Sequence, residues 1–271
     1  MSGRETAGPG AVSGRGERET GVVPSLGRPG SLVATALARA VYEAQTVVAP
    51  VPWLALPLAR LRGHGVPVGR DTEVVIEGYP RSANSFTVAA FRRAQGREVR
   101  VAHHVHAPAQ VVQAVRWRVP ALVLVRRPED AVLEYVLKKA HVTVAQALRG
   151  WVRFYAPLLR WRHGFVVGPF EEVTSDLGAV IRRLNERFGT SFVPFEHTEE
   201  NARAALEELD RWWRDRLGPG LSLEVTVGRP SEVRDRLKEA LRPRYRDPAL
   251  APLRERAEAL YRRFVVESLG G

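Results

Sequence analysis

Three short polar segments carry the residue types that could bind an anion or move a proton. The first is the loop at 79–86, Tyr-Pro-Arg-Ser-Ala-Asn-Ser-Phe, in which small residues alternate with hydrogen-bond donors. The second is the pair Arg126-Arg127, and the third is the run His103-His104-Val105-His106. Arginine suits phosphate and sulfate because its planar fork donates two parallel hydrogen bonds. Neutral histidine serves as a general base. The three segments together predict a site that binds an anionic ligand and transfers a proton.

Each polar segment follows a predicted β-strand, and each strand is followed by a helix. The expected strands are 73–77, 99–102, 121–125 and 164–167. The expected helices are 84–94, 109–117, 127–140, 142–162, 177–188 (ending at Gly189 as its C-cap), 199–217, 231–241 and 254–268. Strands that alternate with helices predict an α/β fold, a central parallel sheet flanked by helices with a mostly helical C-terminal part. Open sheets of this kind bind ligands at the carboxyl ends of their strands, where these segments lie.

The loop and the arginine pair each have a second interpretation. The loop amides and the following helix N-terminus can hold an anion, but Ser82 or Asn84 could equally cap an ordinary helix. The loop lacks the GxxxxGK[ST] pattern of nucleotide triphosphatases. In the second segment, Glu129 and Asp130 could simply complement the helix dipole.

The histidine run could supply a metal pair or a base. Strand alternation would place His104 and His106 on one face and His103 on the other. Because no third ligand follows at a recognisable spacing, we predict no metal. We favour His106 as a general base, since Pro108 begins the next helix and fixes the strand end. His104, two residues deeper in the strand, is expected to be a hydrogen-bonded structural histidine.

Together, these segments resemble the sulfotransferases that use 3′-phosphoadenosine-5′-phosphosulfate. The loop at 79–86 resembles that family's YPKSGTTW loop, Arg126 to Asp130 resembles its R-x-P-x-D segment, and His106-Ala107-Pro108 resembles its His-Leu-Pro. The run 168–188 resembles a further family segment, and order and spacing also match over about residues 72–265. The resemblance implies a bacterial-looking member with a P-loop nucleotide-kinase-like fold.

The resemblance also implies a role for each matching residue. His106 and Arg81 would be catalytic, as the base and as the cation that stabilises the bridging oxygen. The phosphosulfate co-substrate would be bound by the residues of the loop and by the arginine of the second segment, namely Arg81, Ser82, Ala83, Asn84, Ser85, Phe86 and Arg126. The reaction implied is sulfuryl transfer to a hydroxyl or amine of a glycan, lipid or natural product.

The chain departs from the family pattern at three places. Arg81 replaces a lysine, and Ala83 replaces a glycine although alanine adopts positive φ less readily. Glu134 stands where the family has a serine that holds the 3′-phosphate, so a cation such as Arg127, Lys138 or Lys139 would have to intervene. The family's late glycine-rich loop is absent, and Arg229 could cover the 3′-phosphate in its place. Glu134 and Arg229 therefore count as donor-binding candidates.

Composition narrows the alternatives further. The 271 residues include no cysteine, which excludes disulfides and thiolate chemistry, and carry a formal net charge of +11. A chain rich in Ala, Arg and Gly gains such a charge from composition alone, and its arginines lack the aromatic interleaving of single-strand binders, so we expect no nucleic-acid partner. A small-molecule kinase and a non-catalytic phosphoadenosine-binding or anion-binding homologue remain the alternatives.

The N-terminal region differs in character from the rest. Residues 1–30 are Gly-, Pro- and Ser-rich and predict a disordered tail, residues 31–70 a helical arm, and residues 71–271 the sulfotransferase-like domain. The first thirty residues lack the apolar core of a secretory signal, so we expect a cytoplasmic protein. The apolar stripe of the arm is Val33, Ala36, Leu37, Ala40, Val41 and Ala44. We expect the arm to pack on the domain. The alternative is a weak membrane-surface contact through residues 31–64, with Trp53, Arg60, Arg62 and His64.

Overall fold

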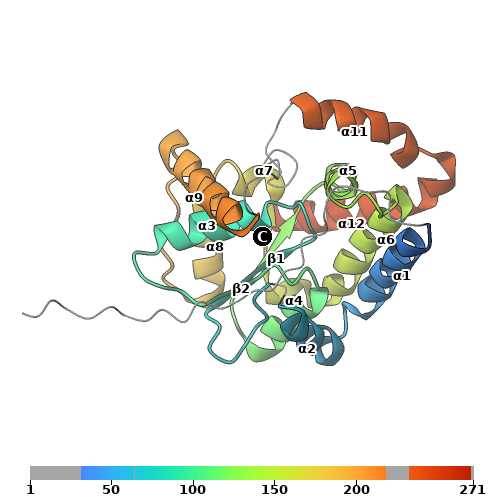
Figure 1. Ribbon diagram of the computed structural model, residues 1–271. Coiled ribbons are helices and arrows are strands. Elements are labelled where there is room, and N and C mark those ends of the chain that lie inside the picture. Colours follow the sequence, from blue (N-terminus) through green and yellow to red (C-terminus); the bar gives the residue numbers. More distant parts are fainter. Residues whose placement is uncertain (1–31, 64, 218–231, 270–271) are drawn as a thin grey trace, which may run out of the picture.

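The structure is a computed structural model that describes residues 32–63, 65–217 and 232–269 (Figure 1). The expectations for residues 1–30, His64 and Arg229 lie outside the described residues. The strands are β1 (Val74–Gly78), β2 (Val101–His103), β3 (Ala121–Val125) and β4 (Val166–Pro169). The helices before β4 are α1 (Leu32–Val48), α2 (Pro52–Arg62), α3 (Asn84–Ala94), α4 (Pro108–Trp117), α5 (Pro128–Lys138), α6 (Val144–Tyr155) and the 3-10 helix Ala156–Gly164. Those after it are α7 (Phe170–Val173), α8 (Leu177–Phe188), α9 (Glu199–Leu217), α11 (Glu232–Tyr245), the 3-10 helix Pro248–Leu250 and α12 (Ala251–Leu269).

A central parallel sheet organises the fold, as predicted from the βα alternation. Its strands lie in the order β2-β1-β3-β4, and every neighbouring pair is parallel. From β1 the chain passes to β2 on one side and then crosses to β3 on the other, so the strand order reverses at β1. Such a reversal marks the position where open α/β sheets bind ligands. The loop after β1 and the arginines after β3 both lie there.

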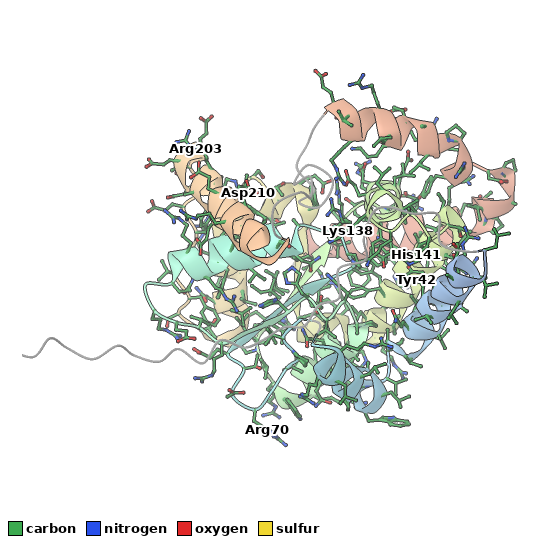
Figure 2. The ribbon with its side chains drawn as sticks, in the orientation of Figure 1. Tyr42, Arg70, Lys138, His141, Arg203 and Asp210 are labelled. Atoms are coloured by element: carbon green, nitrogen blue, oxygen red, sulfur yellow. The ribbon has the colours of Figure 1, made fainter. Side chains whose placement is uncertain are left out.

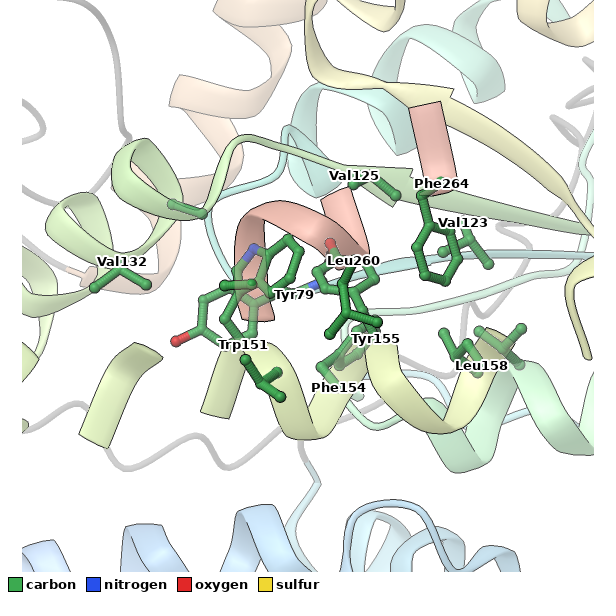
Figure 3. Close-up of a cluster of buried hydrophobic side chains, with 14 of the residues drawn as sticks. Tyr79, Val123, Val125, Val132, Trp151, Phe154, Tyr155, Leu158, Leu260 and Phe264 are labelled. Atoms are coloured by element: carbon green, nitrogen blue, oxygen red, sulfur yellow. Dashed lines mark hydrogen bonds between the residues drawn. The ribbon is translucent and has the colours of Figure 1, made fainter. Parts of the chain in front are cut away.

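Helices cover both faces of the sheet because the strands are apolar on both sides. Val74, Ile76 and Leu122 face a core made with α3 and α8, whereas their neighbours Val75 and Val123 face a core made with α4, α5, α6 and α12. Figure 3 shows this second core, where Tyr79 and Tyr155 pack among aliphatic and aromatic side chains. Tyr79, directly after β1, and Tyr155, the last residue of α6, connect this core to the loop at 79–86.

Several boundaries agree with the sequence expectations. α3, α8 and β3 begin and end where predicted, and Gly189 caps α8 with a φ of 64°. Pro50 and Pro52 separate α1 from α2, because proline cannot continue a helix from the preceding turn. The expected helix 142–162 instead becomes a 3-10 helix from Ala156 onward, next to Pro157.

The helical arm contacts the domain with the face opposite to its predicted apolar stripe. Tyr42 is the buried residue of α1, and its hydroxyl approaches that of Tyr79 at 3.5 Å. A Cβ atom at Gly150 of α6 would collide with the Tyr42 hydroxyl, so this glycine permits the close approach of α1. Val33, Leu37 and Val41 of the predicted stripe are exposed. The arm therefore packs on the domain, but this stripe does not form the contact.

Candidate functional site

The loop after β1 is held from below by buried tyrosines. The Tyr79 hydroxyl donates to the carbonyl oxygen of Ala147 at 2.9 Å. The Tyr79 amide donates to the Tyr155 hydroxyl at 3.3 Å, and that hydroxyl donates to the carbonyl oxygen of Leu124 at 2.7 Å. Tyr155 therefore joins the ends of β1 and β3, the two strands that flank the site.

The start of α3 has the features of an anion site rather than of a capped turn. The residue before the helix is Ala83, and no side chain caps the helix, so Ser82 and Asn84 are not the caps of the alternative interpretation. The Asn84 side-chain amide instead donates to the carbonyl oxygen of Tyr79 at 3.1 Å. The first-turn N–H groups of a helix have no intrahelical acceptor, so an uncapped start can receive an anion. Phe86, by contrast, packs against Phe195 and His197.

Backbone strain is concentrated in the loops after β1 and β2. Among the described residues, five non-glycine residues have positive φ, and four of them are Arg81 (73°), Ala83 (65°), His104 (60°) and His106 (53°). Each such residue costs on the order of 1 kcal/mol, and strain of this kind collects at functional sites. The two predicted segments are therefore held in unusual backbone conformations by their surroundings.

Arg81, Arg126 and Glu134 lie together at the carboxyl ends of β1 and β3. Arg81 Nη2 lies 3.2 Å from Glu134 Oε2, and both side chains are nearly buried. Arg126 Nη1 donates to the backbone carbonyl of Arg81 at 3.0 Å, and its guanidinium stacks 4.0 Å from the centre of the Phe170 ring. Burial lowers the pKa of Arg81 and of Arg126, while the Glu134 carboxylate opposes that shift. Arg81, Arg126 and Glu134, three of the residues that the sequence analysis expected to bind the phosphosulfate co-substrate, thus lie in one cluster.

The cations that contact Glu134 include two that the sequence analysis did not name. In addition to Arg81, they are Arg234, which donates to Oε2, and Lys238, whose Nζ lies 3.6 Å from Oε1. Both come from α11, whereas the expected Arg127 is exposed and lies 4.0 Å from Glu171. Burial alone would raise the pKa of Glu134, but the Arg234 hydrogen bond and the surrounding arginines outweigh it, so the pKa is lowered. The carboxylate is a counter-ion for several cations.

Lys138 is part of the same electrostatic environment. It lies near the middle of the molecule at the end of α5 (Figure 2). Burial, together with the positive charges of Arg81, Lys139 and Arg234, lowers its pKa to about 8. Burial is the larger cause of this shift, and the three neighbouring cations add to it. The cations Arg81, Lys139 and Arg234 near Lys138 favour binding of an anion there.

The histidine run lies beside the loop but is not strand throughout. β2 ends at His103, and the positive φ values of His104 and His106 exclude the strand alternation assumed in the prediction. His103 Nε2 lies 3.2 Å from Arg92 Nη2, His103 Nδ1 lies 2.7 Å from His104 Nδ1, and His104 Nε2 lies 2.9 Å from Ser85 Oγ.

This chain of contacts fixes proton positions. Because arginine only donates, a neutral His103 accepts at Nε2 and donates from Nδ1. His104 then accepts at Nδ1 and donates from Nε2 to Ser85, so the Ser85 hydroxyl hydrogen points to another acceptor. His104 is thereby hydrogen-bonded within the protein, and its partner Ser85 becomes a donor at the start of α3.

His106 is oriented by acceptors at one ring nitrogen. Its Nδ1 lies 2.9 Å from the carbonyl oxygen of Gly78 and 3.4 Å from Glu77 Oε1. Both partners are acceptors, so Nδ1 carries a proton and the neutral ring presents Nε2 as its base. Glu77 is completely buried and also accepts from the amides of Gly78 (3.0 Å) and Val105 (2.9 Å) and from Gln110 Nε2 (3.0 Å).

Sequence reasoning missed Glu77, Tyr155 and Arg234. A signal for Glu77 existed, because it is a charged residue within an apolar strand directly before the loop. No local signal identified Arg234, which lies 100 residues from Glu134 in the sequence. Within the described part of the chain, no group of three His, Asp or Glu side chains is arranged to hold a metal.

Comparisons with known proteins give a structural likeness and no sequence match. No family model matches the chain, and no curated protein matches its sequence. Among solved structures, the chain is similar to mouse sulfotransferase SULT7A1 complexed with PAP, with a TM-score of 0.37 and 11% identity. The similarity covers 71% of this chain and 91% of that chain. A likeness of this size does not assign a role to any residue.

Proposed function

We propose that the protein transfers a sulfuryl group from 3′-phosphoadenosine-5′-phosphosulfate to a hydroxyl or amine. The observation that carries this proposal is the contact between His106 Nδ1 and the Gly78 carbonyl, the last residue before the anion-binding loop. That contact joins the base and the loop into one hydrogen-bonded unit. The motif resemblance of these same segments supports the choice of sulfate donor.

Different site residues would bind the two ends of the donor, the 5′-phosphosulfate and the 3′-phosphate. The 5′-phosphosulfate would lie on the amides at the start of α3, with Ser85 donating its hydroxyl hydrogen. Arg81 would neutralise charge on the oxygen that leaves with the 5′-phosphate. Arg126 would hold the 3′-phosphate, and Arg234 and Lys238, which contact Glu134, would add positive charge there. Catalysis would then rest on positioning and electrostatic stabilisation, as in phosphoryl transfer.

The reaction balances without a further co-reactant. The acceptor oxygen or nitrogen forms a bond to sulfur while the bond between sulfur and the bridging phosphate oxygen breaks. The acceptor proton passes to His106 Nε2, and 3′-phosphoadenosine-5′-phosphate leaves. Loss of a general base costs about 10²–10⁴ in rate, so His106→Ala should lose most turnover and keep its affinity for the nucleotide product.

Calorimetric titration tests the donor. We expect 3′-phosphoadenosine-5′-phosphate to bind more tightly than 5′-AMP or ATP, with a 3′-phosphate contribution of about 1.5–3 kcal/mol. Arg126→Ala should remove most of that difference. Arg127→Ala is the matched control, because Arg127 is exposed and directed to Glu171. Equal affinity of the wild-type protein for all three nucleotides would refute the proposal, and preference for ATP would favour a kinase.

The contact between Arg81 and Glu134 favours one second candidate, a non-catalytic phosphoadenosine-binding protein. An arginine held by a carboxylate is less available to a leaving phosphate oxygen. A screen of hydroxyl and amine acceptors with the sulfate donor separates the two functions. Nucleotide binding without formation of 3′-phosphoadenosine-5′-phosphate across the screen would favour the binding protein.

A further inference from the structure

The predicted apolar stripe of α1 faces solvent. Val33, Leu37 and Val41 follow one another at intervals of four, which places them on one face of the helix. Their exposed fractions are 76%, 64% and 42%. Val47 lies near this face toward the end of the helix, and Leu32 is the first residue of the helix; both are exposed. An amphipathic helix of a soluble protein ordinarily turns this face to the core.

The polar side of α1 holds the helix on the domain. Glu43 Oε1 accepts from Arg149 Nη2 at 2.6 Å, and Glu43 also accepts from Arg153. Arg153 Nη1 donates in addition to Thr46 Oγ1 at 2.8 Å, and Tyr42 is buried against α6 (Figure 2). Because ion pairs and a buried tyrosine fix the helix in this orientation, the apolar stripe has to remain on the outside.

α2 also carries exposed apolar side chains. Trp53, Leu54 and Leu61 are 74%, 39% and 85% exposed. Within the described residues, eight of the eleven exposed large hydrophobic side chains belong to these two helices. We call this set the outer face, and it consists of Leu32, Val33, Leu37, Val41, Val47, Trp53, Leu54 and Leu61. A concentration of this kind marks an interaction site.

The charges beside the outer face are positive. Between residues 32 and 63 the only acidic residue is Glu43, which is already paired with Arg149 and Arg153. Arg39, Arg60 and Arg62 of the same two helices are exposed. A two-fold contact between two copies would bring identical surfaces together and leave these arginines without acidic partners. Residues 1–30, rich in Gly, Pro and Ser, offer few apolar side chains to cover the face.

We propose that the outer face binds the surface of an anionic membrane. The aliphatic side chains would enter the boundary between headgroups and acyl chains, Trp53 would lie at that boundary, and the arginines would bind lipid phosphates. None of the helices among the described residues is long and apolar enough to cross a membrane. The proposed contact is therefore interfacial, and it does not depend on the proposed sulfuryl transfer.

Vesicle co-sedimentation of the full chain tests the contact. The wild-type protein should bind vesicles of phosphatidylcholine with phosphatidylglycerol, bind phosphatidylcholine alone more weakly, and lose binding as salt rises. The affinity of the double variant Leu37→Ser, Leu61→Ser for the anionic vesicles should be lower than that of the wild-type protein by a factor of about ten or more. Both side chains are exposed, so the variant should fold, and circular dichroism with thermal unfolding checks that it does.

A matched double variant provides the control. Val193→Ser with Leu237→Ser removes two apolar side chains that lie outside the outer face and are 52% and 45% exposed. This variant should bind vesicles like the wild-type protein. Equal binding by all three proteins, or equal binding to both kinds of vesicle, would overturn the proposal. So would a dimer in sedimentation equilibrium that depends on Leu37 and Leu61 while no vesicle is bound, because the face would then belong to a second copy.

Discussion

At the residue scale, the left-handed backbone of Ala83 places the start of α3 where it can receive an anion. Its φ of 65° turns the chain from the loop into the helix without a capping side chain. Alanine meets a steric penalty in this region that glycine does not. The conformation of Ala83 therefore destabilises the protein locally, and the contacts of the neighbouring residues Tyr79 and Asn84 hold the backbone in this conformation.

Ala83→Gly should stabilise the protein by about 0.5–1 kcal/mol, since relief of the strain exceeds the extra entropy of glycine in the unfolded chain. Ala240→Gly, at an exposed helical position of α11, is the control and should destabilise by about 0.5–1 kcal/mol. Denaturant unfolding measures both changes. Destabilisation by Ala83→Gly would contradict the φ assigned to this residue.

Glu134 is the second residue with a separable contribution to stability and binding. Glu134→Ser would leave the buried cations Arg81 and Arg234 without their counter-ion, so we expect a loss of about 3 kcal/mol of unfolding free energy. The same change should strengthen binding of 3′-phosphoadenosine-5′-phosphate about tenfold, because those cations become available to phosphate. Thermal unfolding with and without the nucleotide measures both effects.

Glu129→Ser is the matched control for Glu134→Ser. Glu129 lies on the same helix and contacts Arg242 Nε at 3.0 Å, but that pair is about one-third exposed. Its loss should cost less than about 1 kcal/mol and leave nucleotide affinity unchanged. If Glu134→Ser behaves like Glu129→Ser in both measurements, the counter-ion role of Glu134 is wrong.

At the scale of elements, β1 and the segment after β2 are joined by Glu77. This carboxylate accepts from two backbone amides and from Gln110, and lies near Nδ1 of His106. Glu77→Gln keeps the size of the side chain but turns an N–H group toward one of these donors. We expect a loss of about 2 kcal/mol and an increased fraction of the His106 tautomer protonated at Nε2.

Nitrogen-15 NMR of the histidine rings measures the tautomer, and thermal unfolding measures the stability. Glu73→Gln is the control, because Glu73 pairs with Arg97 at the other end of the strand, at the surface. It should leave the His106 tautomer unchanged. An unchanged tautomer in Glu77→Gln would show that Gly78 alone orients the ring.

The elements also show what local sequence can and cannot predict. α3 and α8 were predictable because apolar spacing, and in α8 the C-cap glycine Gly189, act within a few residues. The orientation of α1 was not, because the pairs between Glu43 and two arginines of α6, more than 100 residues away, override its amphipathic pattern. The three segments of the candidate site were found because they lie at strand ends. Arg234 was missed, since only the folded chain brings α11 to Glu134.

At the scale of the whole molecule, one of the positive charges that give the chain its net charge of +11 is largely buried, at Lys138. A lysine with a lowered pKa releases its proton in the folded state while the unfolded chain still holds one. Between the folded value of about 8 and the ordinary value of 10.5, the unfolded state therefore binds more protons, and stability rises with pH. Below about pH 8 the buried charge opposes folding by a constant amount.

Lys138→Met should remove the buried positive charge and with it the free-energy cost of burying that charge on folding. Because the lysine is partly accessible, we expect the free energy of unfolding to rise by an amount on the order of 1–2 kcal/mol at pH 7. This gain should shrink as the pH rises toward the ordinary pKa of lysine. Denaturant unfolding across this pH range measures the gain. Arg236→Met is the control for lost positive charge, because Arg236 is exposed on α11, and its effect should be small and independent of pH. A variant of Lys138 that is less stable than the wild-type protein at pH 7, or whose advantage does not change with pH, would show that the buried ammonium is paired well enough to favour folding.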